Sequence, residues 1–431
     1  MKISYFAVLV RGFYINLTGK PYTVVSQKES GFIPNGAMII EIDTLENEKS
    51  AASNLNIACE TWKKSNSGIK NNAAVTDSKE QDFHITLPSC IALTANGKPE
   101  VLFWTGCDLD CARKRLSEKD DSPLIENKTI SSAGNQVVNS AVSHAVSSSV
   151  VNSAERANVV KNRIALVTGG AQGIGEEIVR NLAAAGALVF IADLNFEGAK
   201  TLVDKINANE NRTASIAVKV NVASEESVEE MFDIIAETAG GFDICISNAG
   251  VLKAGSVLEQ DLSDFKFVTD INYTGFFVIS KFAGRLLRTQ HFTAPLWKTD
   301  IIQVNSKSGL EGSNKNGAYA GGKFGGLGLV ASFAMELVEY GIKVNAVCPG
   351  NFLDGPLWSD PEKGLFVQYL RTGKVPGAKS IADVRTFYES KVPMKRGCTG
   401  KDLVRAIYYI IEQEYETGQA VPVTGGQIML H

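Results

Sequence analysis

The sequence predicts an α/β fold, a doubly wound parallel sheet with helices on both faces, preceded by a small α+β region. Two observations support this prediction. From residue 161 onward, short apolar runs alternate with amphipathic stretches of helical length, which is typical of a parallel sheet with helical crossovers. The first apolar run also ends in a glycine-rich loop, residues 168–175, where a strand is expected to pass into a helix.

The composition of the 431 residues excludes several classes of protein. The formal net charge of −4 gives no electrostatic reason to bind nucleic acid or an anionic membrane. The 7 cysteines are odd in number and scattered, and there are only 4 histidines, so we expect neither a disulfide framework nor a metal site. No apolar run is long enough to span a bilayer. These features favour a cytoplasmic protein whose partner is a small molecule.

The chain is expected to divide into three parts. Residues 1–120 form an α+β domain of unknown function, which we interpret as a structural extension rather than a regulatory or interaction domain. Residues 121–160 are a low-complexity linker rich in Ser, Asn, Ala and Val. Residues 161–431 form the α/β domain. In the first part we expect strands at residues 5–10, 37–42 and 101–104, a helix at 51–62, and a hairpin turn at Asn96-Gly97.

The elements of the third part follow one another in a regular order. A long stretch near its end, residues 351–391, is expected to be a loop that closes over the substrate. An insertion at residues 291–300 is expected to be a surface loop. Strands are expected at residues 164–170, 188–194, 215–222, 243–250, 301–304 and 343–347, and helices at 176–185, 197–207 and 225–239.

The glycine-rich loop predicts a dinucleotide site. Gly169, Gly173 and Gly175 let the main chain approach a pyrophosphate closely and place it at a helix N-terminus, whose free N–H groups favour an anion. Asp193 ends the second strand, 18 residues after Gly175. A carboxylate there can bind ribose hydroxyls and repels a 2′-phosphate, and the loop carries no Arg or Lys. The pattern therefore favours NAD over NADP.

Tyr319 and Lys323 form the second chemical feature. Four residues make about one helical turn, so the two side chains share a helix face. A nearby ammonium lowers the pKa of a tyrosine, which otherwise titrates near ~10, and makes it able to exchange a proton. Ser306 precedes Tyr319 by 13 residues and could hold the same reacting oxygen. The pair alone is weak, because Tyr-x-x-x-Lys occurs often by chance.

Together the motifs resemble the short-chain dehydrogenase/reductase family. They are the Thr-Gly-x-x-x-Gly-x-Gly loop from Thr168, the Asn-Ala-Gly from Asn248, and Ser306 with Tyr319 and Lys323. The resemblance implies a Rossmann-like domain and a catalytic tetrad completed by Asn272. It implies that Tyr319 is the general acid or base, that Ser306 binds the substrate oxygen, that Lys323 lowers the Tyr319 pKa and binds the nicotinamide ribose, and that Asn272 supports the proton relay.

The resemblance also implies the residues that contact the cofactor. In the family a Thr that touches the nicotinamide carboxamide usually follows the Pro-Gly pair, but this chain has Asn351-Phe352-Leu353-Asp354 there, which leaves that contact unassigned. The expected cofactor residues are Gly169, Gln172, Gly173, Ile174, Gly175, Asp193, Leu194, Asn221, Val222, Asn248, Ala249, Gly250, Tyr319, Lys323, Pro349 and Gly350.

The substrate is suggested by four stretches, residues 301–309, 317–329, 391–398 and 423–429. They resemble family members that oxidise D-sorbitol 6-phosphate at C2 to D-fructose 6-phosphate with reduction of NAD. The phosphate would need cationic donors, for which Lys307, Lys395 and Arg396 are candidates beside Ser306. Another polyol, sugar or sugar phosphate is an alternative substrate, and a catalytically idle NAD-binding regulator is an alternative function. The resemblance also implies a homo-oligomer, a tetramer or a dimer.

Overall fold

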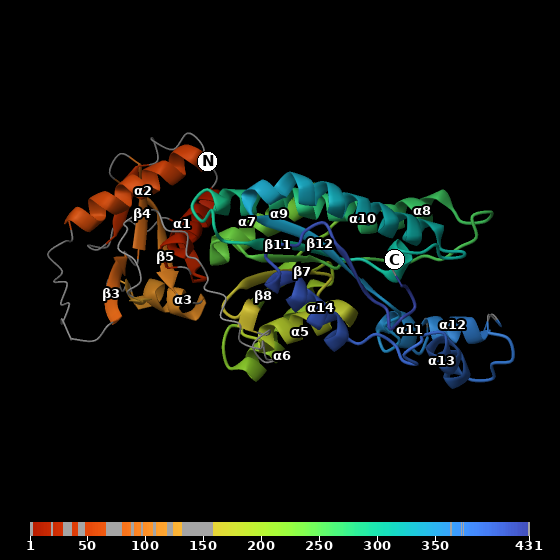
Figure 1. The fold of residues 1–431 in the computed structure, drawn as a ribbon. Helices are drawn as coiled ribbons and strands as arrows, with labels where there is room; N and C mark the ends of the chain where they lie inside the picture. The colour runs from red at the N-terminus through yellow and green to blue at the C-terminus, as the bar shows by residue number, and fades with distance from the viewer. Residues whose placement is uncertain are drawn as a thin grey trace. The chain divides into compact units, whose positions relative to one another are not determined.

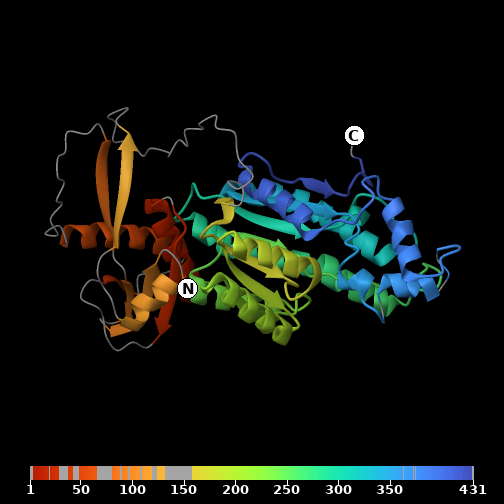
Figure 2. The ribbon, with the colours of Figure 1, turned by 90° about the horizontal axis from the view of Figure 1, so that it is seen from below.

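The computed structural model describes most of the chain. The described residues are 3–18, 20–28, 37–41, 48–65, 80–87, 90–95, 98–106, 109–118, 124–131, 158–362, 364–371, 373 and 375–429. The chain forms two compact units (Figures 1 and 2). The first comprises Met1–Val151, Ile235–Gly241 and Arg288–Trp297, and the second comprises the rest.

The first unit combines helices and strands, as predicted. Its described helices are α1 (Ile3–Thr18), α2 (Glu48–Ser65) and α3 (Leu109–Glu118). One sheet has the order β1-β5-β4-β2, made of β1 (Thr23–Lys28), β5 (Lys98–Gly106), β4 (Cys90–Ala95) and β2 (Met38–Glu41). A separate antiparallel pair, visible in Figure 2, joins β3 (Glu80–Leu87) to β6 (Leu124–Ser131).

Several predictions for this unit are confirmed and one is wrong. The expected strands near residues 37–42 and 101–104 are β2 and β5, and the expected helix is α2. The antiparallel β4–β5 pair is the expected hairpin, although its turn, residues 96–97, lies outside the described residues. Residues 5–10 belong to helix α1, not to a strand. Phe6 to Val10 are buried on every side of that helix, so the apolar run carries no period that separates helix from strand.

The second unit is built on a parallel sheet. Within the described residues it has 7 strands in the order β13-β12-β11-β10-β7-β8-β9. The order reverses between β7 and β10, which leaves a crevice at the carboxyl ends of these strands, where α/β folds bind ligands. The strands are β7 (Ile164–Thr168), β8 (Leu188–Asp193), β9 (Ser215–Lys219), β10 (Ile244–Ser247), β11 (Thr299–Val304), β12 (Ile342–Pro349) and β13 (Ala420–Val423).

Helices cover both faces of this sheet (Figure 1). A helix covers a sheet in this way when one of its faces is apolar. Helix α14 is an example, and the apolar face that it buries against the strands is made of Leu403, Val404, Ile407, Ile410 and Ile411. One layer holds α5 (Gly173–Ala184), α6 (Phe196–Glu210) and α14 (Gly400–Glu412), and the other holds α7 (Glu225–Ala239), α8 (Leu262–Thr269), α9 (Gly275–His291) and α10 (Gly317–Leu337). This arrangement confirms the predicted fold class.

One expected loop is only partly at the surface, and the other is largely helical. Residues 292–298 of the insertion lie in turns between α9 and β11, where Leu296 is 63% exposed but Thr293 and Ala294 are 4% and 1% exposed. Residues 351–391 contain three short helices, α11 (Pro356–Ser359), α12 (Leu365–Arg371) and α13 (Ile381–Ser390). These helices share a small apolar core that includes Trp358, Phe366 and Val384. Among the described residues, no helix is long and apolar enough to cross a membrane.

Candidate active site

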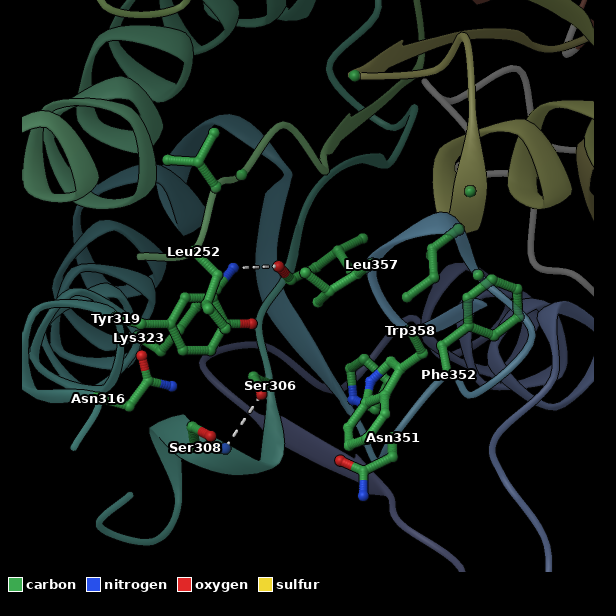
Figure 3. Close-up of a pocket in the computed structure, with 18 of the residues that line it drawn as sticks. Leu252, Ser306, Ser308, Asn316, Tyr319, Lys323, Asn351, Phe352, Leu357 and Trp358 are labelled. Carbon is green, nitrogen blue, oxygen red and sulfur yellow. Dashed lines mark hydrogen bonds between the residues drawn. The ribbon is translucent and has the colours of Figure 1, made fainter. Parts of the chain in front are cut away.

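A cavity of about 1030 Å³ lies in the second unit. Its lining includes the residues that follow β7, β8, β10, β11 and β12, and side chains of the α11–α13 segment also contribute (Figure 3). Every residue predicted to contact the cofactor lines it, as do Ser306, Tyr319 and Lys323 from the predicted tetrad. The position is the crevice that the strand order predicts.

The glycine-rich loop is packed too closely to accept side chains. Gly169 and Gly173 have φ values of +62° and +59°, which only glycine adopts without strain. A Cβ on Gly175 would lie 2.1 Å from the main-chain oxygen of Gly169, and one on Gly169 would lie 2.8 Å from Cα of Ala249. The loop leads into the N-terminus of α5, whose first N–H groups suit a pyrophosphate. This cradle fits a dinucleotide.

Asp193 is fixed at the end of β8. Its Oδ2 accepts a hydrogen bond of 2.9 Å from the Ala171 N–H, and its Oδ1 accepts one of 2.8 Å from the Asn195 N–H. An ionised carboxylate has about four acceptor positions, so both oxygens can still accept ribose hydroxyls. Among the described residues that line the cavity, none is an arginine.

The Asn-Ala-Gly segment ties β10 to the glycine loop. Asn248 Nδ2 donates to the main-chain oxygens of Thr168 (3.0 Å) and Gly169 (2.9 Å). In return, the Thr168 hydroxyl accepts from the N–H groups of Asn248 (3.0 Å) and Ala249 (3.1 Å). Asn248 therefore fixes the shape of the cradle.

Ser306, Tyr319 and Lys323 meet at one end of the cavity (Figure 3). Ser306 follows β11 and caps a short 3-10 helix, where its Oγ accepts a hydrogen bond of 3.1 Å from the Ser308 N–H. Lys323 is 5% exposed, and its Nζ donates a hydrogen bond of 2.9 Å to the oxygen of Val304. The same Nζ lies 5.6 Å from the centre of the Tyr319 ring. The spacing of these residues in the sequence thus brings them together as expected.

The pKa of Tyr319 shifts in the opposite direction from the prediction. Burial raises it above the ordinary value, and the hydrogen bond with Ser306 only partly opposes this. Burial also lowers the pKa of Lys323 to about 8. The prediction considered the ammonium alone and not the burial of the phenol, which disfavours the charged phenolate.

Asn272 does not line the cavity, but it lies close to Lys323. It is 3% exposed and sits in a π-helical turn, Asp270–Thr274. Its Oδ1 accepts from the Val251 N–H and its Nδ2 donates to the Val251 oxygen, both at 2.8 Å. A Cβ on Gly250 would lie 3.3 Å from Asn272 Oδ1 and 3.8 Å from Lys323 Nζ. The Asn272 amide therefore holds the segment after β10 beside the lysine.

The predicted phosphate donors are only partly at the cavity. Lys307 lines it, but Lys395 and Arg396 do not. Arg396 forms an ion pair with Asp402, with Nη2 to Oδ1 at 3.0 Å, and Lys395 Nζ donates to the Ser390 oxygen at 2.9 Å. Both cations contact other groups in this structure, and neither lines the cavity, so their assignment to the substrate stays a prediction without structural support.

Sequence reasoning missed the contribution of the α11–α13 segment. Lys391, which caps the C-terminus of α13, lines the cavity with Trp358, Tyr369 and Tyr388. Its Nζ lies 4.1 Å from the centre of the Phe387 ring, a cation–π distance. Lys391 begins one of the stretches that suggested the substrate, but only the fold of α13 shows that it reaches the cavity.

Comparisons with known proteins match this part of the chain. A family model described as short chain dehydrogenase matches residues 163–360. Sorbitol-6-phosphate 2-dehydrogenase of Escherichia coli (strain K12) is 34% identical over 271 residues, which are 62% of this chain and 99% of that protein. Meso-2,3-butanediol dehydrogenase of Serratia marcescens is 30% identical over 56% of this chain and 96% of its own length.

Solved structures agree with the sequence comparisons. The crystal structure of sorbitol-6-phosphate 2-dehydrogenase SrlD from Erwinia amylovora is 36% identical, with a TM-score of 0.57, and covers 62% of this chain and 100% of that chain. An actinorhodin polyketide ketoreductase solved with NADPH is 25% identical, with a TM-score of 0.54, over 62% of this chain and 97% of its own.

Proposed function

Because the chain belongs to the short-chain dehydrogenase family, we propose that it is an NAD-dependent dehydrogenase that interconverts D-sorbitol 6-phosphate and D-fructose 6-phosphate. One observation carries the choice of a phosphorylated substrate. Among the described residues that line the cavity, Asp193 is the one acid, and it belongs to the cofactor end. The other charged lining residues are Lys253, Lys307, Lys315, Lys323 and Lys391.

This cationic lining suits a phosphate monoester. Lys253 forms an ion pair with Asp264, and Lys323 is held by Val304, so neither is the best candidate. Lys307 adjoins Ser306, and Lys391 projects from the α11–α13 segment. A phosphate bound by either lysine would gain charge-assisted hydrogen bonds, which are about twice as strong as neutral ones.

The choice of NAD rests on Asp193. Its carboxylate suits two ribose hydroxyls and repels the 2′-phosphate of NADP. The absence of arginine from the described lining residues supports the same choice. NAD, when bound, supplies the hydride acceptor for the oxidation.

Each residue of the site then has its own role in the proton transfer. In oxidation, Tyr319 as phenolate accepts the proton of the C2 hydroxyl, and in reduction Tyr319 as phenol returns a proton to the ketone oxygen. Ser306 donates a hydrogen bond to that oxygen. Lys323, held in place by Val304, stabilises the phenolate while it is charged. Asn272 positions the Val251 main chain beside Lys323.

The proposal is tested by NADH formation with sorbitol 6-phosphate, beside sorbitol, mannitol 1-phosphate and galactitol 6-phosphate, for the full chain and for Tyr319→Phe. We expect turnover of sorbitol 6-phosphate that the substitution reduces by about 10²–10⁴-fold. Turnover of an unphosphorylated polyol alone would contradict the phosphate assignment. NAD binding without turnover of any of these compounds would favour a regulator.

A homo-oligomer, a dimer or a tetramer, is part of the same proposal. Phe277 on α9 and Phe324 and Met335 on α10 are 46%, 47% and 83% exposed. The two helices are neighbours, because Phe277 packs on Phe333 with ring centres 6.3 Å apart. An apolar face of this kind supports contact with a second copy. The scattered thiols, among them Cys245, Cys348 and Cys398, support a cytoplasmic location.

A further inference from the structure

Asn316 is a buried residue at the wall of the cavity whose amide oxygen lacks a hydrogen-bond partner. It is 9% exposed, and it occupies the N-cap position of α10. Within the described part of the chain, its Oδ1 has no hydrogen-bond partner and its side chain makes no capping bond. It lines the same cavity as Tyr319 (Figure 3).

A side chain without a capping hydrogen bond is unusual for an asparagine at an N-cap position. An N-cap side chain normally accepts a hydrogen bond from an N–H of the first helical turn. Buried polar atoms nearly always have a partner, and the exceptions call for an explanation. Asn316 lines the cavity, although its Oδ1 is itself shielded from solvent in this orientation. A rotation that exchanges its oxygen and nitrogen would let it either accept or donate there.

The position of Asn316 relative to Tyr319 and Ser306 restricts which part of the substrate Asn316 can bind. It precedes Tyr319 by three residues on the same helix, a spacing that places side chains as neighbours. Ser306 lies across from Asn316. In the proposed mechanism the Ser306 hydroxyl donates a hydrogen bond to the reacting oxygen of the substrate. Figure 3 shows Asn316, Tyr319 and Ser306 around one end of the cavity. A group bound by Asn316 is therefore next to the carbon that is oxidised.

We propose that Asn316 hydrogen-bonds the hydroxyl on the carbon adjacent to the oxidised one, so that the site selects vicinal diols over isolated secondary alcohols. A hydroxyl both donates and accepts, which matches the two ends of an amide. A site that leaves a buried polar group unpaired when the hydroxyl is missing discriminates strongly against that analogue. The inference rests on the proposed dehydrogenase function, and it does not depend on the phosphate.

The test combines two substitutions with a pair of substrates, using the full chain. Asn316→Leu keeps the size and removes both polar ends, whereas Asn316→Asp keeps an acceptor. The substrates are sorbitol 6-phosphate and its 1-deoxy and 3-deoxy analogues, which lack one or the other hydroxyl next to C2. We expect Asn316→Leu to lower kcat/KM for sorbitol 6-phosphate by about 10- to 100-fold, the effect of one lost hydrogen bond in a closed site. For the analogue that lacks the recognised hydroxyl, kcat/KM should change by less than about 3-fold.

Further readouts separate recognition from a structural role. Removing a side chain whose buried amide oxygen has no partner should leave the melting temperature of Asn316→Leu equal to or above that of the unaltered protein. The NADH dissociation constant, measured by fluorescence, should be unchanged, and Asn316→Asp should retain part of the discrimination. An equal loss with both deoxy analogues and with sorbitol 6-phosphate, or a lower melting temperature, would overturn the inference.

The inference can fail separately from the proposed substrate. If the unaltered protein does not oxidise sorbitol 6-phosphate, the substrate proposal is wrong, and the same comparison is made with meso-2,3-butanediol and 2-butanol. A loss with Asn316→Leu confined to the diol would then support the role of Asn316. If neither pair is turned over, the dehydrogenase function and this inference fail together.

Discussion

Lys323 donates a hydrogen bond of 2.9 Å to the main-chain oxygen of Val304, the last residue of β11. Asn305 completes the link, since its Nδ2 donates to the Lys323 oxygen at 2.9 Å. Helix α10, which carries Tyr319 and Lys323, is thus tied to the carboxyl end of the strand that leads to Ser306. One side chain supplies both a charge near Tyr319 and a structural connection.

Replacing Lys323 by Met should therefore affect both activity and stability. Loss of the ammonium should lower kcat by about 10²–10³-fold, the usual effect of removing one fixed electrostatic group. The buried Val304 oxygen loses its partner, which should cost about 1–3 kcal/mol. Steady-state NADH formation and thermal melting measure the two effects. Turnover within tenfold of the unaltered protein would contradict the catalytic role.

The pKa values predict opposite pH dependences for the two directions. Burial raises the pKa of Tyr319, so the phenol is protonated near neutral pH in the free protein. Oxidation needs the phenolate and should become faster as the pH rises from about 7 to about 9, whereas reduction needs the phenol and should slow. The pKa of Lys323 is about 8, so its charge is lost over the same range, which should flatten the rise.

Initial rates in both directions across this range check the prediction, with Tyr319→Phe as the control for background reaction. An oxidation rate that is constant or falls from about pH 7 to about pH 9 would show that the Tyr319 pKa is not raised in the working enzyme.

The sequence was sufficient for the parallel sheet and for the cofactor cradle. Strand and helix periods differ, and the glycine loop stands where the first strand of the sheet turns into a helix. The spacing of three residues in the sequence also predicts that they lie together, and Ser306, Tyr319 and Lys323 line one cavity.

The failures have physical causes. An apolar run that is buried on all sides has no period, so the pattern at residues 5–10 predicts a strand where the chain forms a helix. Spacing could not show that Lys323 donates a hydrogen bond to Val304, or that Tyr319 is buried deeply enough for its pKa to be raised. Lys391 and Asn316 become visible only when the folds of α13 and α10 place them at the cavity.

Asp193 should control the choice between NAD and NADP. Asp193→Asn keeps an acceptor for the Asn195 or Ala171 N–H but removes the charge that repels a 2′-phosphate. We expect NAD to bind more weakly and the ratio of kcat/KM for NADP to that for NAD to rise by about tenfold or more. Asp204→Asn, an exposed carboxylate on α6, is the matched control. An unchanged ratio in Asp193→Asn, measured alongside NADH and NADPH dissociation constants, would argue against this assignment.

Lys391 and Lys395 provide a matched pair for the phosphate. They are four residues apart, but Lys391 lines the cavity, whereas Lys395 donates to the Ser390 oxygen. If Lys391 binds the phosphate, Lys391→Gln should raise KM for sorbitol 6-phosphate by about tenfold or more, as expected for a lost charge-assisted hydrogen bond. Lys395→Gln should change KM by less than about twofold, because a solvated surface charge contributes little.

Two comparisons make this last prediction specific to the phosphate. Oxidation of unphosphorylated sorbitol, if measurable, should be insensitive to Lys391→Gln, since no anion is present to lose a contact. Added salt should raise KM for the phosphorylated substrate more in the unaltered protein than in Lys391→Gln, because screening acts on the charge that the variant lacks. Equal effects of Lys391→Gln and Lys395→Gln would instead assign the phosphate to another group, of which Lys307 is the next to substitute.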